Sequence, residues 1–178
     1  ASAIRYTVGT NAYGYRGYGD VFVFVFFGLV STFGSYFMFA KELNFLLLLP
    51  SFAIGFLSVG VLNLNNMRDE ESDKKAGKNT IVVQKGGEWA KKYHYFLIIS
   101  AMVLVVLFAV LNDFHFDQYL FLAAYFPLAS HLITVKRNKN PKLLDPELKK
   151  LALSTFFLCI LLALSVIYFI SDILVNYI

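Results

Sequence analysis

The chain has 178 residues, of which 58% are hydrophobic and only 16% are charged, and its formal net charge is +4. A soluble domain carries about 25% charged residues, so this composition excludes an ordinary water-soluble fold. The single cysteine, Cys159, excludes a disulfide framework, and we expect it to be a small packing residue in a helix.

Five stretches contain no Asp, Glu, Lys or Arg and approach the roughly 20 apolar residues that a membrane-spanning helix needs. Backbone polar groups in lipid must be paired within their own segment, which favours helices over strands. The predicted fold is therefore all-α, a polytopic bundle of five transmembrane helices. The predicted spans cover residues 21–40, 45–64, 93–111, 119–135 and 151–170.

The basic residues are confined to alternate connections between these spans. Of the 16 Lys and Arg residues, 15 lie in residues 2–20, 68–92 and 136–150. The positive-inside rule places these three segments on the cytoplasmic side. The positive charge thus reports topology, and we expect no nucleic-acid partner.

The chain begins at Ala1 with a loop rich in tyrosine and glycine. We expect residues 1–178 to be the C-terminal portion of a single transmembrane domain, with further spans preceding them in the natural protein.

A polar cluster follows the second span. If the helix continues through it, Asn65, Asp69 and Asp73 share one face at i, i+4 and i+8, and Asn66 joins them. Two carboxylates one turn apart repel each other unless a positive charge lies between them. Carboxylate and amide oxygens suit Mg²⁺, which commonly bridges carboxylates to substrate phosphates. The spacing predicts Asp69 and Asp73 as metal ligands.

Cations flank this cluster. Arg68 offers a planar fork for phosphate oxygens, and Gly77 permits a left-handed turn that presents Lys78 and Thr80. A solvated charged loop is the alternative. The order Asn-Asn-x-Arg-Asp-x-x-x-Asp-x-x-x-Gly-Lys-x-Thr is more specific than charge content, and it favours a diphosphate site.

These residues resemble the second aspartate-rich motif of the UbiA superfamily of intramembrane prenyltransferases. The paired asparagines and Gly-Lys-Asn-Thr are similar to the branch that prenylates 1,4-dihydroxy-2-naphthoate in menaquinone synthesis. Residues 5–20 resemble the loop before that branch's fifth helix, and residues 145–148 (Asp-Pro-Glu-Leu) resemble the segment leading into its last helix. The family has nine helices and two such motifs, so the five spans would correspond to helices five to nine, without the first motif.

The resemblance implies a reaction and a location. A polyprenyl diphosphate would ionise with the help of Mg²⁺, and the ring of 1,4-dihydroxy-2-naphthoate would attack the allylic cation to form demethylmenaquinol. The enzyme would lie in the bacterial inner membrane as a multi-pass protein, embedded in the lipid bilayer with its active-site loops in the cytoplasm.

The resemblance also implies roles for single residues. Asp69 and Asp73 would hold Mg²⁺, Asn65 and Asn66 would orient them, and Arg68 and Lys78 would contact the diphosphate. In the first loop, Tyr6 is predicted to stabilise the allylic cation through its ring face, and Arg5 and Tyr13 to bind substrate. An interfacial aromatic belt and positive-inside anchoring explain these loop residues equally well.

Several apolar and histidine residues have more ordinary interpretations. His131 lies inside a span, and we favour a hydrogen bond to a neighbouring helix over a functional role. His94 and His115 are expected at the membrane interface. Most of the phenylalanines between residues 22 and 39 are expected to face lipid or pack, although some could line an isoprenoid tunnel. Glycines at positions 28, 34, 55 and 60 would permit close helix approach.

Two alternatives stay open at this stage. Another UbiA-type aromatic prenyltransferase, acting on 4-hydroxybenzoate or in haem synthesis, would share the mechanism. A non-catalytic transport or scaffold subunit would use the acidic motif as an ion or partner site. The absence of Asp, Glu, Lys and Arg from all five predicted spans favours chemistry at the cytoplasmic face over transport.

Overall fold

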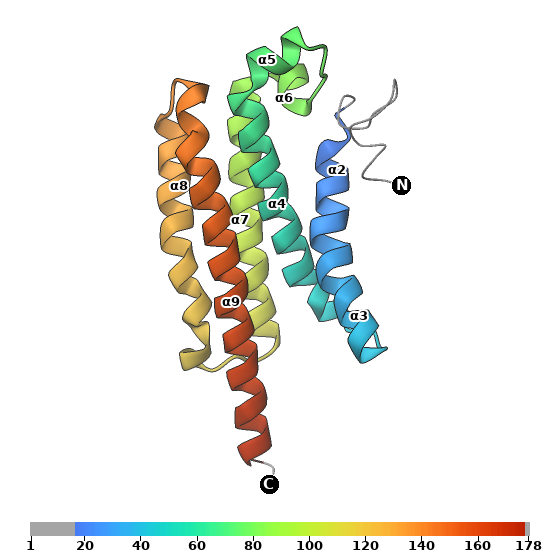
Figure 1. Ribbon diagram of the computed structural model, residues 1–178. Coiled ribbons are helices and arrows are strands. Elements are labelled where there is room, and N and C mark those ends of the chain that lie inside the picture. The colour runs from blue at the N-terminus through green and yellow to red at the C-terminus, as the bar shows by residue number, and fades with distance from the viewer. Residues whose placement is uncertain (1–16, 177–178) are drawn as a thin grey trace.

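The computed structural model describes residues 17–176, with side chains described to residue 167. Within that part of the chain every regular element is a helix, and five helical stretches are long and apolar enough to cross a membrane. They run nearly parallel or antiparallel to one another as a bundle (Figure 1). The predicted all-α polytopic fold is confirmed, and the chain has the architecture of a multi-pass membrane protein.

The first span is a composite of three helical segments: α2 (Gly19–Val23), the π-helix η2 (Phe24–Gly34) and α3 (Ser35–Ala40). It ends where Lys41 adopts a left-handed conformation. Gly28 touches the second span so closely that an added Cβ would lie 2.7 Å from the Cα of Gly55. The predicted close approach is confirmed at this pair, whereas Gly34 has no such neighbour within 3.4 Å.

The second span is the centre of the bundle. It consists of the short 3₁₀ helix η3 (Phe45–Leu47), which Asn44 caps, and α4 (Leu48–Arg68). Because α4 packs against η2, α7 and α9, its buried positions alternate between several partners rather than following one stripe. A residue on α4 can therefore contact three other spans.

The polar connection after α4 folds into two short helices, α5 (Glu70–Lys75) and α6 (Ile81–Lys85). Gly77 has a φ of 70°, so the predicted left-handed turn is confirmed. The Thr80 side chain accepts a hydrogen bond from the backbone N–H of Val83 and so caps α6.

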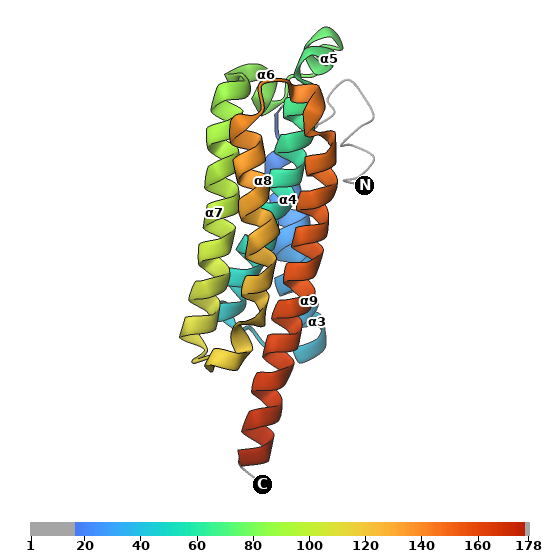
Figure 2. The same ribbon diagram turned by 90° about the vertical axis from the view of Figure 1, so that its left-hand side faces the viewer.

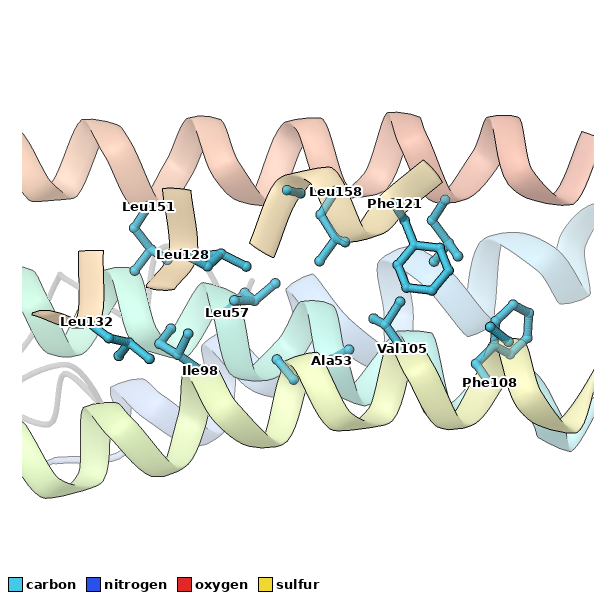
Figure 3. Close-up of a cluster of buried hydrophobic side chains, with 14 of the residues drawn as sticks. Ala53, Leu57, Ile98, Val105, Phe108, Phe121, Leu128, Leu132, Leu151 and Leu158 are labelled. Atoms are coloured by element: carbon cyan, nitrogen blue, oxygen red, sulfur yellow. The ribbon is translucent and has the colours of Figure 1, made fainter. Parts of the chain in front are cut away.

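The last three spans are α7 (Gly87–Leu111), η4 (Phe116–Ala124) with α8 (Tyr125–Arg137), and η5 (Pro141–Leu144) with α9 (Asp145–Asn176). Two tyrosine hydroxyls tie α7 to α8: Tyr95 donates to the carbonyl of Leu132, and Tyr125 donates to that of Met102. The apolar core lies between α4, α7, α8 and α9, and Figure 3 shows Leu57, Ile98 and Leu158 pointing into it.

The basic connections gather at one end of the bundle. The start of α2, the α5–α6 connection and the α8–α9 turn all lie at one end, as two views show (Figures 1 and 2). These connections carry most of the basic residues, so the structure confirms that they share one side. Large apolar side chains such as Phe39, Phe96 and Phe126 are exposed on the outside, as lipid contact requires. Cys159 is also exposed, so its expected packing role is wrong.

Candidate functional site

The polar cluster lies at the end of α4 that is predicted to face the cytoplasm. The helix breaks at Asp69, where φ is −99° and ψ is 8°. The backbone N–H of Asp69 still bonds the carbonyl of Asn65 at 3.0 Å, and that of Asp73 bonds the carbonyl of Asp69 at 2.8 Å. The backbone hydrogen bonds from i+4 to i that join these three residues therefore survive the break.

Arg68 is the organising side chain of this cluster. Its guanidinium donates two hydrogen bonds to the Asp69 carboxylate, both at 2.8 Å, and one to Oδ1 of Asn65 at 2.8 Å. A fourth donor, Nη1, lies 2.5 Å from Oδ1 of Asp145 at the start of α9. A planar fork with several fixed donors is suited to such multiple contacts. One cation thus joins the end of α4 to α9, a partner that no spacing rule could identify across 77 residues.

The charge state of Asp69 follows from this contact. The hydrogen bonds and charge of Arg68 lower the pKa of Asp69 below its ordinary value, and the nearby charge of Lys78 acts in the same direction. Partial burial opposes these effects without overcoming them. Asp69 is consequently an anion at neutral pH and can serve as a ligand for a cation.

Asp73 forms a second ion pair. The ammonium of Lys78 lies 3.1 and 3.2 Å from the two carboxylate oxygens of Asp73, which is nearly buried. The turn at Gly77 brings Lys78 back over the helix, and its backbone N–H bonds the Asp73 carbonyl at 2.9 Å. Each predicted metal ligand is therefore paired with a predicted diphosphate contact.

A small polar cavity of about 10 Å³ lies beside Lys78, lined also by Asp20, Asn66 and Thr80. Asn66 is 3% exposed, and its Oδ1 has no hydrogen-bond partner among the described residues. Asp20 is 6% exposed. Asp20 is not among the predicted site residues, because its distance in sequence from Asn66 hides the packing of α2 on α4.

An apolar groove of about 450 Å³ begins at Asn65 and follows α4 into the bundle. Its walls come from α2, η2, α4 and α9, so the first, second and fifth spans all contribute. Of the phenylalanines in the first span, Phe27 lines this groove, whereas Phe24 packs against Phe52 and Phe56. Asn65 thus belongs both to the polar cluster and to the groove. The other lining residues are Val23, Ser58, Val61, Leu62, Leu148, Ala152 and Thr155.

The oxygen-bearing side chains of this cluster are of the type that binds Mg²⁺, but they supply only part of a full set of ligands. Asp69, Asp73 and the free oxygen of Asn66 are hard ligands. Within the described residues, no three His, Cys, Asp or Glu side chains come together to hold a metal ion. Mg²⁺ commonly uses one or two carboxylates and fills its remaining positions with water and phosphate, so two carboxylates suffice for one arm of a site.

The remaining predictions divide into three groups. Arg5, Tyr6 and Tyr13 lie outside the described residues. His115 is exposed at the start of η4, as expected. His94, expected at the interface, is completely buried, so that interpretation is wrong. It failed because the structured helix α7 begins six residues before the apolar stretch, which moves His94 into the bundle.

Comparison with known proteins gives this membrane bundle a family. Residues 1–153 match the model of the UbiA prenyltransferase family. The chain belongs to that family.

Curated relatives are similar over most of this chain. A protein of Haemophilus influenzae is 39% identical over 166 residues, which are 93% of this chain and 54% of the relative. A protein of Escherichia coli is 41% identical over 149 residues, or 84% and 48% of the two chains. A third, from Mycobacterium tuberculosis, is 38% identical over 104 residues, or 58% and 36%. All three are named 1,4-dihydroxy-2-naphthoate octaprenyltransferase, and the chain spans about half the length of the first two. No solved structure matches the chain.

Proposed function

We propose that this chain forms part of an integral-membrane enzyme that transfers a polyprenyl group from polyprenyl diphosphate to 1,4-dihydroxy-2-naphthoate. Diphosphate leaves the donor and the ring carboxylate leaves the acceptor as carbon dioxide, yielding demethylmenaquinol. One observation carries the proposal: Asn65 joins a cluster of paired cations and carboxylates to the mouth of an apolar groove. A prenyl diphosphate has the same two parts, a charged head and an apolar tail. The names of the relatives support the choice of acceptor.

The pairing within the cluster suggests how the head group is accepted. Arg68 and Lys78 neutralise Asp69 and Asp73 in the structure. We propose that the two carboxylates hold Mg²⁺ in the working enzyme, which would supply positive charge to the departing diphosphate. The two cations then turn their N–H groups toward the diphosphate oxygens, because charge-assisted bonds to phosphate replace those to the carboxylates.

The groove accounts for the rest of the substrate. The allylic carbon–oxygen bond lies at the junction of head and tail, so it would break beside Asn65, and the electron-rich ring would attack there. Water is scarce in an apolar groove, which protects the allylic cation from hydrolysis. By the positive-inside rule this junction lies on the cytoplasmic side of the membrane, which we propose is a bacterial inner membrane. We also propose that Tyr6 stabilises the allylic cation and that Arg5 and Tyr13 bind substrate.

Substitution of the two carboxylates tests the proposal. The full-length parent protein, reconstituted in lipid, should transfer a polyprenyl group to dihydroxynaphthoate in a magnesium-dependent manner. Asp69→Asn and Asp73→Asn should each lower the rate by about 100-fold, which is the upper end of the range of losses seen when a group around a metal is removed. Glu71→Gln is the matched control, since Glu71 lies between them on α5 with an exposed side chain. Equal rates in all four proteins would overturn the site, and transfer to 4-hydroxybenzoate instead would replace the acceptor.

A further inference from the structure

Directly behind the polar cluster, four spans share a buried chain of hydrogen bonds. Nε2 of His94 on α7 lies 2.8 Å from Nε2 of His131 on α8. Nδ1 of His131 lies 2.7 Å from the carboxylate of Glu147 on α9, which Lys150 also contacts at 2.6 Å. Both histidines are completely buried and Glu147 is 5% exposed. The expectation that His131 bonds to a neighbouring helix is confirmed, and it bonds to two.

Asn63, at the far end of this series of hydrogen bonds, sets the direction of every bond in it. The side-chain amide nitrogen of Asn63 on α4 donates to the carbonyl of Ala90 at 3.0 Å, and a carbonyl can only accept. The same nitrogen faces Nδ1 of His94 at 3.4 Å. That ring nitrogen must therefore be an acceptor, so the proton of a neutral His94 is on Nε2.

The remaining protons follow in order. Because His94 donates from Nε2, the facing Nε2 of His131 accepts, and the proton of His131 is on Nδ1. His131 then donates from Nδ1 to the carboxylate of Glu147, which also accepts from Lys150. A doubly protonated His131 would donate from Nε2, so Nε2 of His94 would have to accept and the His94 proton would move to Nδ1. There it would face the Asn63 amide nitrogen, which is also a donor. Only one arrangement satisfies all these groups.

This arrangement holds α9 in one position along its axis. A buried polar contact between helices contributes little net stability compared with apolar packing, but it can specify a single register, as buried polar residues do in helical assemblies. Glu147 is two residues from Asp145, which bonds Arg68. A shift of α9 relative to α8 would carry Asp145 away from the guanidinium.

We infer that His131 and Glu147 are positioning residues, which hold Arg68 in place for the head group through Asp145. The reaction in which Arg68 takes part rests on the proposed function, whereas the fixed tautomers and the coupling to Arg68 do not. Gly60 supports the same arrangement, since an added Cβ would lie 2.9 Å from Ile98 and 3.7 Å from the His94 ring.

Nuclear magnetic resonance tests this series of hydrogen bonds without measuring any reaction. In the full-length protein in lipid nanodiscs with ¹⁵N-labelled histidine, His94 should carry its proton on Nε2 and His131 on Nδ1. A doubly protonated His131, or one protonated only on Nε2, would overturn the inference. The Arg68 Nη1–H group, which bonds Asp145, should exchange slowly with solvent in the parent protein and at least tenfold faster in His131→Leu, as expected for loss of an outer-shell partner.

A conservative variant separates positioning from general loss of folding. His131→Gln keeps one donor and one acceptor and should restore slow exchange at Arg68, whereas His115→Gln, at the opposite end of the bundle, should match the parent. In the transfer assay, His131→Leu should raise KM for the polyprenyl diphosphate about tenfold and leave KM for the aromatic acceptor within about twofold. Unchanged exchange at Arg68 in His131→Leu would overturn the coupling. An inactive parent with the expected exchange and tautomers would instead refute the proposed function alone.

Discussion

The contact between the first two spans gives the sharpest test of the packing. In Gly28→Ala, the new Cβ would lie 2.7 Å from both the Cα of Gly55 and the carbonyl oxygen of Ser51. Carbon atoms pack best at about 3.5–4.0 Å, and these neighbours are backbone atoms that cannot rotate away. The helices must separate by about 1 Å. We expect a loss of about 1–3 kcal/mol in the free energy of unfolding, the usual range for overpacking.

Gly34→Ala is the matched control, because it makes the same chemical change at the end of the same π-helix. There the nearest atoms to the new Cβ lie at 3.8 and 3.9 Å, an ordinary contact. Helix propensity alone should then stabilise this variant by up to about 0.5–1 kcal/mol. Unfolding of both variants should be followed by circular dichroism in mixed micelles with increasing denaturing detergent. Equal effects at the two glycines would refute the close-approach argument.

Three further predictions concern polar contacts of single side chains. Thr80→Ala removes the cap of α6 and should destabilise that helix by about 1 kcal/mol, measurable as faster amide exchange in its first turn. Tyr95→Phe removes a bond of 2.6 Å from α7 to α8 and should lower the free energy of unfolding by about 0.6 kcal/mol. Arg68→Gln should raise the pKa of Asp69 toward its ordinary 3.8, seen by carboxyl ¹³C titration. The ion pair stabilises the fold above that pH and loses its effect as the pH falls through the lowered pKa, so the parent should resist acid better than this variant.

Local chemistry explains why much of this protein was predictable. Lipid requires each span to satisfy its own backbone, so an apolar stretch of sufficient length indicates a helix whatever surrounds it. The turn at Gly77 and the common face of Asn65, Asp69 and Asp73 depend on positions only a few residues apart. The spans and the turn at Gly77 were confirmed because the interactions that create them are short in sequence.

The failures were at contacts between helices. His94 was assigned to the interface because a span end was inferred from hydropathy, which says nothing about what a neighbouring helix offers. Cys159 was expected to pack against a neighbouring helix. Its side chain is exposed, because the partners of α9 decide which of its faces is covered. Asp20 was missed because its burial depends on α2 lying against α4.

The sequence by itself determined the number of spans, the gathering of the basic segments at one end, and the order of the acidic and basic groups after the second span. Each follows from the cost of exposing polar groups to lipid or from helical periodicity. Only the tertiary structure decided that Arg68 bonds Asp145, that His94 meets His131, and that Asn65 opens onto an apolar groove. Those contacts join residues far apart in the chain, and their geometry exists only once the helices have packed.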